Sequence, residues 1–232
     1  MKTWWYSQGI QIKLQIIIQL VLIAVLIPTQ LWIERHFKEE ILLAAERRAR
    51  VSADGVINGM NMLMMNGMIK DPENRALYIR KMGSSEGVKE LRVIRAGQVQ
   101  QQFGPGLPQE QPMDEMDRRV IASSKEEFLR VDDENAPELR VVVPFILSTN
   151  FRGTNCLDCH EAKSGSASGA ASITLDLKGD YASLNKTSAL LWSGQAVLQL
   201  VLFFLIGRFT HTITRPLENL QTTMSALQKE ED

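Results

Sequence analysis

Two long apolar runs stand out from the alternation of polar and apolar positions along this chain. Residues 14–33 carry no formal charge, and residues 189–207 form a second uncharged run of nearly the same length. A helix of about 20 apolar residues crosses the hydrocarbon core of a bilayer. The pattern predicts two transmembrane helices, with a central segment (34–188) between them and short segments outside (1–13 and 208–232).

The first apolar run is predicted to be a retained anchor and not a cleaved secretory signal. Basic residues precede it, as in a signal, but its apolar core is too long and no small-residue cleavage site follows Trp32. An unpaired amide is costly in lipid, so we expect Gln15, Gln19 and Gln30 within this run to face a partner helix or the interface.

Helical spacing continues beyond the first run. Apolar positions between residues 34 and 68 recur at that spacing with charged side chains on the other side, so this stretch is expected to extend the first span as one long helix. Pro72 suits a first helical turn, and residues 75–82 are predicted to form a further short helix.

The pattern changes to the period of strands after residue 87. Five strands are predicted, at residues 91–95, 99–103, 127–131, 139–147 and 170–177, with Gly97 as a hairpin turn and residues 132–135 as an exposed hairpin loop. Residues 112–123 are expected to be a helix. This order predicts an α+β domain, a five-stranded antiparallel sheet with helices on one side.

The segment after the second apolar run has a coiled-coil pattern. Following Pro216, Leu217, Leu220, Met224 and Leu227 recur at alternating spacings of three and four. The pattern predicts a helix with a seam for a partner helix, and an ordinary amphipathic helix at the membrane surface is the alternative.

Charge and cysteine content narrow the function. The formal net charge is −1, which argues against a nucleic-acid partner. The only two cysteines lie in Cys156-Leu157-Asp158-Cys159-His160. This CxxCH spacing is typical of covalent c-type haem, because two thiols add to the porphyrin vinyl groups and the next residue offers its imidazole to the iron. Cys156 and Cys159 are the predicted thioether anchors, and His160 is the predicted proximal iron ligand.

Three other readings of the motif are weaker. A thioredoxin-like redox pair would follow a strand directly, a disulfide would close a very small loop, and zinc would need further ligands. The remaining histidines are His36 and His211.

The predicted haem also orients the chain. Attachment of c-type haem takes place after export, so the central segment is expected in the periplasm of a bacterium, with both termini in the cytoplasm and two spans in the inner membrane. Lys2 and Lys13 before the first span, with Arg208 and Arg215 after the second, favour this orientation, whereas basic residues after the first span weaken the bias.

The loop predicted to carry the haem, residues 148–168 and called the haem loop below, shows a family resemblance. Residues 150–160 (NFRGTNCLDCH), preceded by residues 103–108 (FGPGLP), look like the haem-c sensor region of bacterial methyl-accepting chemotaxis proteins and sensor kinases. Residues 215–227 look like the first helix of a HAMP linker. The resemblance implies a periplasmic PAS-like or single-Cache fold that dimerises in parallel along its long helices and passes a displacement through the second span into HAMP. An α+β module unrelated to PAS is the alternative.

A sixth iron ligand is expected from the methionine-rich end of the long helix. Met60, Met64 and Met68 share one helix face, and Met60 and Met64 are the better held pair, being further from the helix end. Related haem-c sensors also place methionine on this helix. Adaptable core packing is the alternative role. Candidate partners of the haem propionates are Arg92, Arg95, Arg140 and Arg152.

Two functions of different class follow. The first is a membrane-anchored haem sensor of redox state or of a small gas such as nitric oxide, acting as a parallel homodimer on a downstream signalling protein. The second is an electron-transfer cytochrome, free or as an accessory subunit of a respiratory or photosynthetic complex. The lack of an output domain after the HAMP-like helix favours this second function. A haem-free adhesion or scaffold domain is a third. Apart from His36, no histidine remains to activate a serine in the central segment, so no enzyme is expected.

Overall fold

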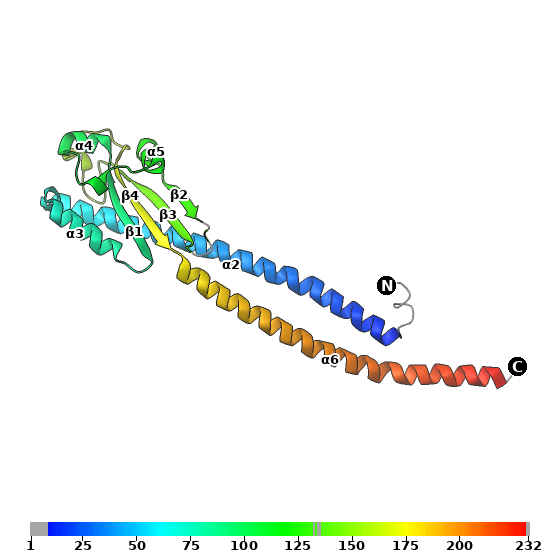
Figure 1. The fold of residues 1–232 in the computed structure, drawn as a ribbon. Coiled ribbons are helices and arrows are strands. Elements are labelled where there is room, and N and C mark those ends of the chain that lie inside the picture. The colour runs from blue at the N-terminus through cyan, green and yellow to red at the C-terminus, as the bar shows by residue number, and fades with distance from the viewer. Residues whose placement is uncertain (1–8, 132, 134–135, 231–232) are drawn as a thin grey trace. The chain divides into compact units, whose positions relative to one another are not determined.

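The computed structural model describes the backbone of residues 9–131, 133 and 136–230, and the side chains of these residues except 10, 11, 210, 211 and 213–230. Its helices and strands are α2 (Ile10–Met65), η1 (Met68–Lys70), α3 (Pro72–Gly83), β1 (Val88–Arg95), α4 (Gly97–Phe103), η2 (Pro108–Glu110), α5 (Glu115–Ser123), β2 (Glu127–Val131), β3 (Glu138–Ile146), η3 (Cys156–Asp158), β4 (Ala167–Asp176) and α6 (Lys178–Glu230) (Figure 1). The chain divides into two compact units, Lys38–Ala182 and the two flanking segments, Met1–Phe37 and Ser183–Asp232.

The unit Lys38–Ala182 is built around an antiparallel sheet. Among the described residues the sheet has four strands in the order β1-β4-β3-β2 (Figure 1). Strand β4 lies between β1 and β3, and β2 pairs with β3 at the edge. The predicted α+β class is confirmed, and four of the predicted strands occur within a few residues of their expected positions. The hairpin loop predicted at residues 132–135 falls largely outside the described residues.

The prediction of a strand at residues 99–103 is wrong. This segment belongs to helix α4, and Gly97, which was expected to form a hairpin turn, is its first residue. The run is rich in glutamine, a good helix former, and Gln98 donates to the carbonyl oxygen of Ala167 at 2.9 Å. Gly104 ends the helix with φ near +84°, in a region that favours glycine. Over the part of the chain that the structure describes, the sheet therefore has four strands in place of the expected five.

Helix α2 covers one face of the sheet with small side chains. Alanines at every fourth position of α2 pack directly on inward-facing residues of the central strands. The buried residues of this core are Ala45, Ala49, Ala53, Val56, Met60, Val93, Leu139, Val141, Phe145, Ala171, Ile173, Leu175 and Leu177. Helix α3 packs closely against α2, because the Tyr78 hydroxyl donates to the carbonyl oxygen of Gly55 at 2.8 Å. The long helix predicted over residues 34–68 is thus observed, ending at Met65.

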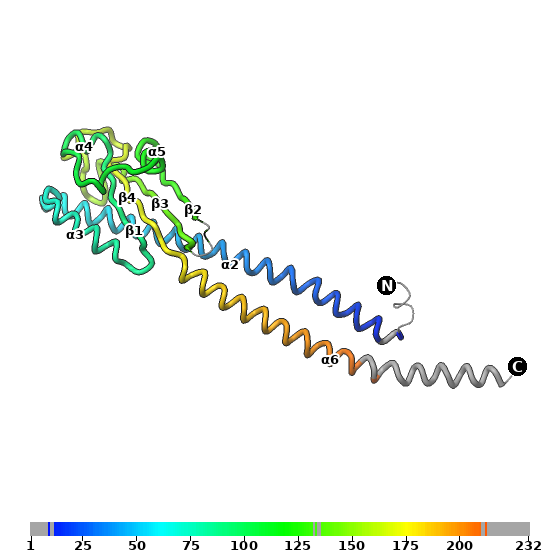
Figure 2. The backbone as a smooth tube through the Cα atoms, in the orientation of Figure 1, coloured from blue at the N-terminus to red at the C-terminus, as the bar shows by residue number. Residues whose placement is uncertain are grey.

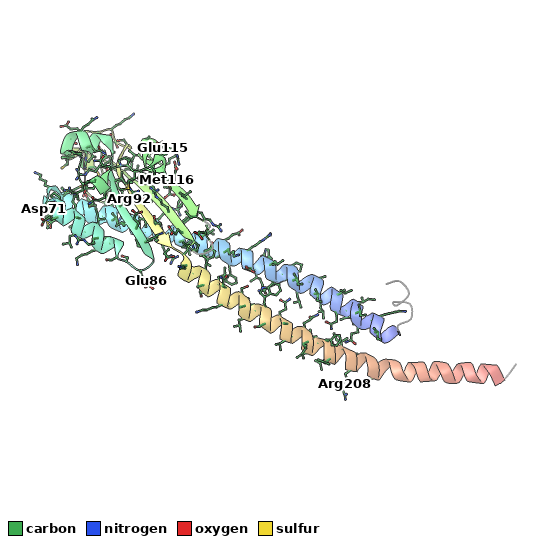
Figure 3. All side chains as sticks on the ribbon, in the orientation of Figure 1. Asp71, Glu86, Arg92, Glu115, Met116 and Arg208 are labelled. Atoms are coloured by element: carbon green, nitrogen blue, oxygen red, sulfur yellow. The ribbon has the colours of Figure 1, made fainter. Side chains whose placement is uncertain are left out.

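The opposite face of the sheet carries helix α5, which corrects the expectation that all helices lie on one side. Ile94 of β1, Val142 of β3 and Ala170 of β4 pack there against Met116 and Val120 of α5. Figure 3 shows Arg92 and Met116 in this region. Helix α5 begins three residues later than predicted because Asp114 caps it, accepting from the Asp117 N–H at 2.9 Å.

The flanking segments contain the two apolar stretches. By length and composition, two helices among the described residues are long and apolar enough to cross a membrane, within Ile12–Met65 and Lys178–Phe209. Gln15 donates to the Phe203 carbonyl oxygen at 2.8 Å, and Gln199 donates to Gln19 at 2.6 Å. Two of the three glutamines in the first apolar run thus face a helix of the same chain.

The backbone of α6 is helical from Lys178 to Glu230, which includes the predicted coiled-coil segment. Figure 2 traces the part of α6 that directly follows β4. The side chains of Leu217, Leu220, Met224 and Leu227 lie outside those described, so the seam remains a prediction. Residues 1–8, with Lys2 of the charge argument, also lie outside the described part of the chain.

Candidate haem-attachment site

The CxxCH motif forms one tight turn in the middle of the long loop between β3 and β4. Cys156 starts the 3₁₀ turn η3, and the N–H groups of Cys159 and His160 both donate to the Cys156 carbonyl oxygen, at 3.3 and 3.0 Å. Asn155 caps the turn by accepting from the Leu157 N–H at 3.2 Å. Residues three apart lie on one side of a 3₁₀ turn, so this backbone places the two cysteines on a common side.

A two-residue hairpin turn leads into the motif. Phe151 and Thr154 exchange backbone hydrogen bonds of 2.7 and 2.9 Å, which enclose Arg152 and Gly153. Both enclosed residues have positive φ, near +50° and +90°. This is the geometry of a type I′ turn, in which glycine suits the second position and arginine is an uncommon first residue. The backbone just before Cys156 is therefore tightly constrained.

The haem loop is tied to helix α2 by side chains. Asn61 of α2 donates to the Thr154 hydroxyl at 3.1 Å, and Arg152 pairs with Asp54 of α2 at 2.5 Å. The Arg152–Asp54 pair is exposed and contributes little to stability. The Asn61 contact is half-buried, so α2 and the loop meet directly beside the motif.

Helix α4 holds the motif from another side. The Gln102 side chain donates to the Cys159 carbonyl oxygen at 2.9 Å and accepts from the Glu161 N–H at 3.0 Å. The ring of Phe103 meets the His160 imidazole edge to face, with centroids 5.5 Å apart and an interplanar angle of 80°. Two consecutive residues of α4 therefore contact the motif around His160.

The imidazole of His160 is half-buried, and burial lowers its pKa below the ordinary value. At neutral pH the ring is therefore neutral, which is the form that donates a lone pair to iron. Its Nδ1 atom is buried and has no hydrogen-bond partner among the described residues. Buried polar atoms without a partner are rare. The Nδ1 atom is therefore available to interact with a group that is not one of the described residues.

These residues fit a c-type haem. Cys156 and Cys159 are both free thiols, Cys159 is exposed, and the turn presents them on one side. His160 follows directly with a neutral imidazole. A haem bound here would be held by the two thioethers and by the His160 nitrogen. The donor set and the backbone geometry are those that attachment requires, whereas a disulfide is absent between the two cysteines.

The two candidate sixth ligands lie in different environments on α2. Met60 is 4% exposed and belongs to the core between α2 and the sheet, whereas Met64, one turn further along, is 40% exposed. Met64 is nearer to the surface on the part of α2 that Asn61 ties to the haem loop. Ligation by either methionine remains a prediction, and the exposed thioether is the freer of the two to move.

Three of the four arginines considered for the propionates are occupied by carboxylates in the interior. Arg95 pairs with the buried Glu110 at 2.8 Å, and Arg92 pairs with the buried Asp117 at 3.1 Å. Arg140 also pairs with Asp117, at 2.6 Å. Arg152 lies in the haem loop, where it forms the exposed pair with Asp54, and pairing of any of the four arginines with a propionate remains a prediction.

Sequence reasoning missed Asn61, Gln102 and Phe103. The segment containing Gln102 and Phe103 was expected to be a strand, which hid the helix that brings both side chains to the motif. The glutamine-rich composition of residues 98–102 was the available signal, since glutamine favours helices over strands.

Comparison of the sequence with models of known protein families gives no match, and no curated protein is similar to it. The assignment of a function therefore depends on the residues and geometry of this chain.

Proposed function

We propose that the chain is a membrane-anchored c-type haem protein whose haem is bound through Cys156, Cys159 and His160. The observation that carries the proposal is the constrained CxxCH turn, with two free thiols and a neutral, half-buried imidazole. A bound haem supplies an iron whose oxidation state and sixth ligand change with conditions. The chain's own residues hold the anchoring thiols on one side, keep the imidazole neutral and limit its exposure to water.

Sensing is the function that the connections of the haem loop favour. The loop contacts α2 through Asn61, and α2 continues without a break into the first apolar segment. At its other end the loop leads into β4, which is followed directly by α6 and the second apolar segment. A displacement at the loop would therefore act on both long helices, as a sensor of redox state or of a small gas such as nitric oxide requires.

Electron transfer is the second candidate. Cys159 and Phe103 are both exposed beside the motif, so a haem edge bound there would be open to a redox partner. A carrier needs such an edge but needs no mechanical connection from the haem loop to α2. The Asn61 contact with Thr154 therefore favours the sensor.

The proposed setting is the bacterial inner membrane, with residues 34–188 in the periplasm and both termini in the cytoplasm. Two apolar helices support the membrane location, and haem attachment after export supports the periplasmic side. We further propose a parallel homodimer that acts through the HAMP-like segment of α6 on a downstream signalling protein.

Haem attachment is tested by producing the full chain together with a cytochrome c maturation system. We expect the denatured wild-type chain to stain for covalent haem. The double variant C156A/C159A should not stain, whereas H160A should retain thioether-bound haem with altered ligation. A wild-type chain that exports and folds but carries no covalent haem would refute the proposal.

Spectra and redox titration then separate the two candidates. A sensor should show ligand exchange at the iron, seen as a change in the ferrous absorption spectrum on adding nitric oxide. An electron carrier should keep both axial ligands in both oxidation states and show no such change.

The substitution M64A tests the sixth ligand, with M62A as the control on an exposed methionine of the same helix.

A further inference from the structure

The Gln102 side chain forms hydrogen bonds to the backbone on both sides of His160, the residue predicted to bind iron. Its amide donates to the carbonyl oxygen of Cys159, immediately before His160, and accepts from the N–H of Glu161, immediately after it. Both contacts are made to backbone groups, at 2.9 and 3.0 Å. Only one orientation of the amide satisfies both bonds, because one partner accepts and the other donates.

Phe103 acts on the side chain of the same histidine. Its ring packs edge to face with the imidazole at a centroid distance of 5.5 Å, an arrangement favoured between aromatic rings. The Phe103 ring thus restricts rotation of the His160 ring, whereas Gln102 fixes the backbone that carries it. The two neighbouring residues constrain different degrees of freedom.

Helix α4 is a firm support for these two side chains. At its start, Gln98 donates to Ser166 and to the Ala167 carbonyl oxygen, at 3.2 and 2.9 Å, where the haem loop enters β4. At its end, Arg95 of β1 donates to the Gly104 carbonyl oxygen at 3.3 Å. The helix is therefore joined to the sheet at both ends, and the contacts of Gln102 and Phe103 are held against a fixed base.

We infer that Gln102 and Phe103 are positioning residues that set the orientation of the His160 imidazole towards the haem iron. The inference rests on the proposed haem attachment and extends it. Residues that hold a metal ligand in place affect the affinity and the electronic properties of the metal without touching it. The two Gln102 hydrogen bonds act on the backbone on either side of His160, and the Nδ1 atom of His160 has no hydrogen-bond partner among the described residues.

The test uses full-length protein purified in detergent after haem maturation. Q102A removes both hydrogen bonds, and Q102E keeps the acceptor for Glu161 but loses the donor to Cys159. Q101A is the matched control, since the neighbouring Gln101 side chain is exposed on the same helix. F103A removes the ring contact, and F103L keeps most of its bulk.

We expect every variant to retain covalent haem, because the thioethers do not depend on α4. Q102A and F103A should broaden or split the ferric electron paramagnetic resonance signal, since the imidazole takes several orientations. After nitric oxide binds, the ratio of molecules without the histidine–iron bond to molecules with it should be about thirtyfold higher in Q102A, as expected for two lost hydrogen bonds. Q102E should be intermediate, and Q101A should match the wild type.

The outcomes separate this inference from the proposed function. Wild-type protein without covalent haem overturns both. Haem-loaded wild type, with Q102A and F103A unchanged in resonance signal and in nitric oxide binding, overturns the positioning role alone. If Q102A fails to fold, Q102E and F103L are compared with the wild type in its place. Spectra identical to those of the wild type in both variants would contradict the inference. A lower melting temperature with unchanged spectra would show that the contacts stabilise the fold without positioning the ligand.

Discussion

The carboxylate of Asp114 makes two contacts at the start of α5. One oxygen accepts from the Asp117 N–H and caps the helix, and the other pairs with Arg140 of β3. Arg140 also contacts the fully buried Asp117, which in turn pairs with Arg92. Removing the buried Asp117 would take this partner from both arginines in the interior, which costs several times more than an exposed pair contributes. Asp114 is 43% exposed, and without it Arg140 keeps its contact with Asp117. Single residues here fix how α5 sits on the sheet.

This arrangement predicts the response of the fold to acid. Hydrogen bonding to the Arg140 guanidinium lowers the pKa of the Asp114 carboxyl below its ordinary value, although partial burial opposes the shift. The unfolded chain therefore takes up this proton first on acidification. The stabilisation is complete above the ordinary carboxyl pKa of about 4 and is lost as the pH falls towards the lower folded-state value.

We expect D114N to keep the helix cap, since asparagine caps as well as aspartate, but to lose the ion pair. The variant should be less stable than wild type by about 0.5–1 kcal/mol at pH 7, and the difference should shrink in acid. Thermal unfolding followed by circular dichroism at several pH values measures this. E115Q, which neutralises an exposed carboxylate one residue further on, is the control. Equal pH dependence in the two variants would contradict the prediction.

Helix α4 shows how one short element determines the geometry of the site. It starts at Gly97 and ends at Gly104, and an added Cβ would meet nothing within 4 Å at either glycine. The two positions differ in backbone conformation. Gly104 has φ near +84° and ψ near 167°, a region essentially restricted to glycine, whereas Gly97 has no positive φ.

Substitution by alanine should therefore have opposite effects at the two ends of α4. We expect G104A to destabilise the fold by about 1–3 kcal/mol through backbone strain alone. G97A should be neutral or stabilising by up to about 1 kcal/mol, because alanine restricts the unfolded chain. Chemical denaturation of both variants provides the measurement. A stable G104A with an unchanged environment of His160 would show that the end of α4 is not constrained as described.

On the scale of the whole molecule, α2 has an exposed side that the sheet does not cover. Leu43, Val51, Met62 and Met65 are exposed and lie within one side of the helix by their spacing. A partner helix can bury exposed apolar side chains that share one side of a helix. A second copy of α2 in parallel orientation would bury them, consistent with the proposed homodimer.

The dimer is tested by placing a charge on this side of α2. Val51 is 72% exposed, so V51E should not disturb the fold but would bring two like charges together in a parallel dimer. We expect the cross-linked dimer in membranes to fall by about tenfold or more relative to wild type. L77E, at an exposed apolar position on α3, is the control. Dimer formation equal in V51E and wild type would exclude this side of α2 as the interface.

Local patterns in the sequence determined the elements that depend on neighbouring residues. Uninterrupted apolar runs predicted the two apolar helices, and the alternation of apolar and polar residues predicted the four strands. The CxxCH spacing identified the candidate haem ligands because the chemistry requires those residues close together in the chain. The helical pattern after residue 34 also predicted the long course of α2.

Tertiary structure decided the rest, because it depends on contacts between residues far apart in the chain. The position of residues 99–103 after the predicted turn at Gly97 suggested a strand, although their glutamine-rich composition favours a helix, and the helix forms where Gln98 reaches β4. Gln102 and Cys159 are separated by 57 positions, so no local pattern links them. The buried partners of Arg92 and Arg95, and the core position of Met60, are fixed only when α2 and α5 pack on opposite faces of the sheet.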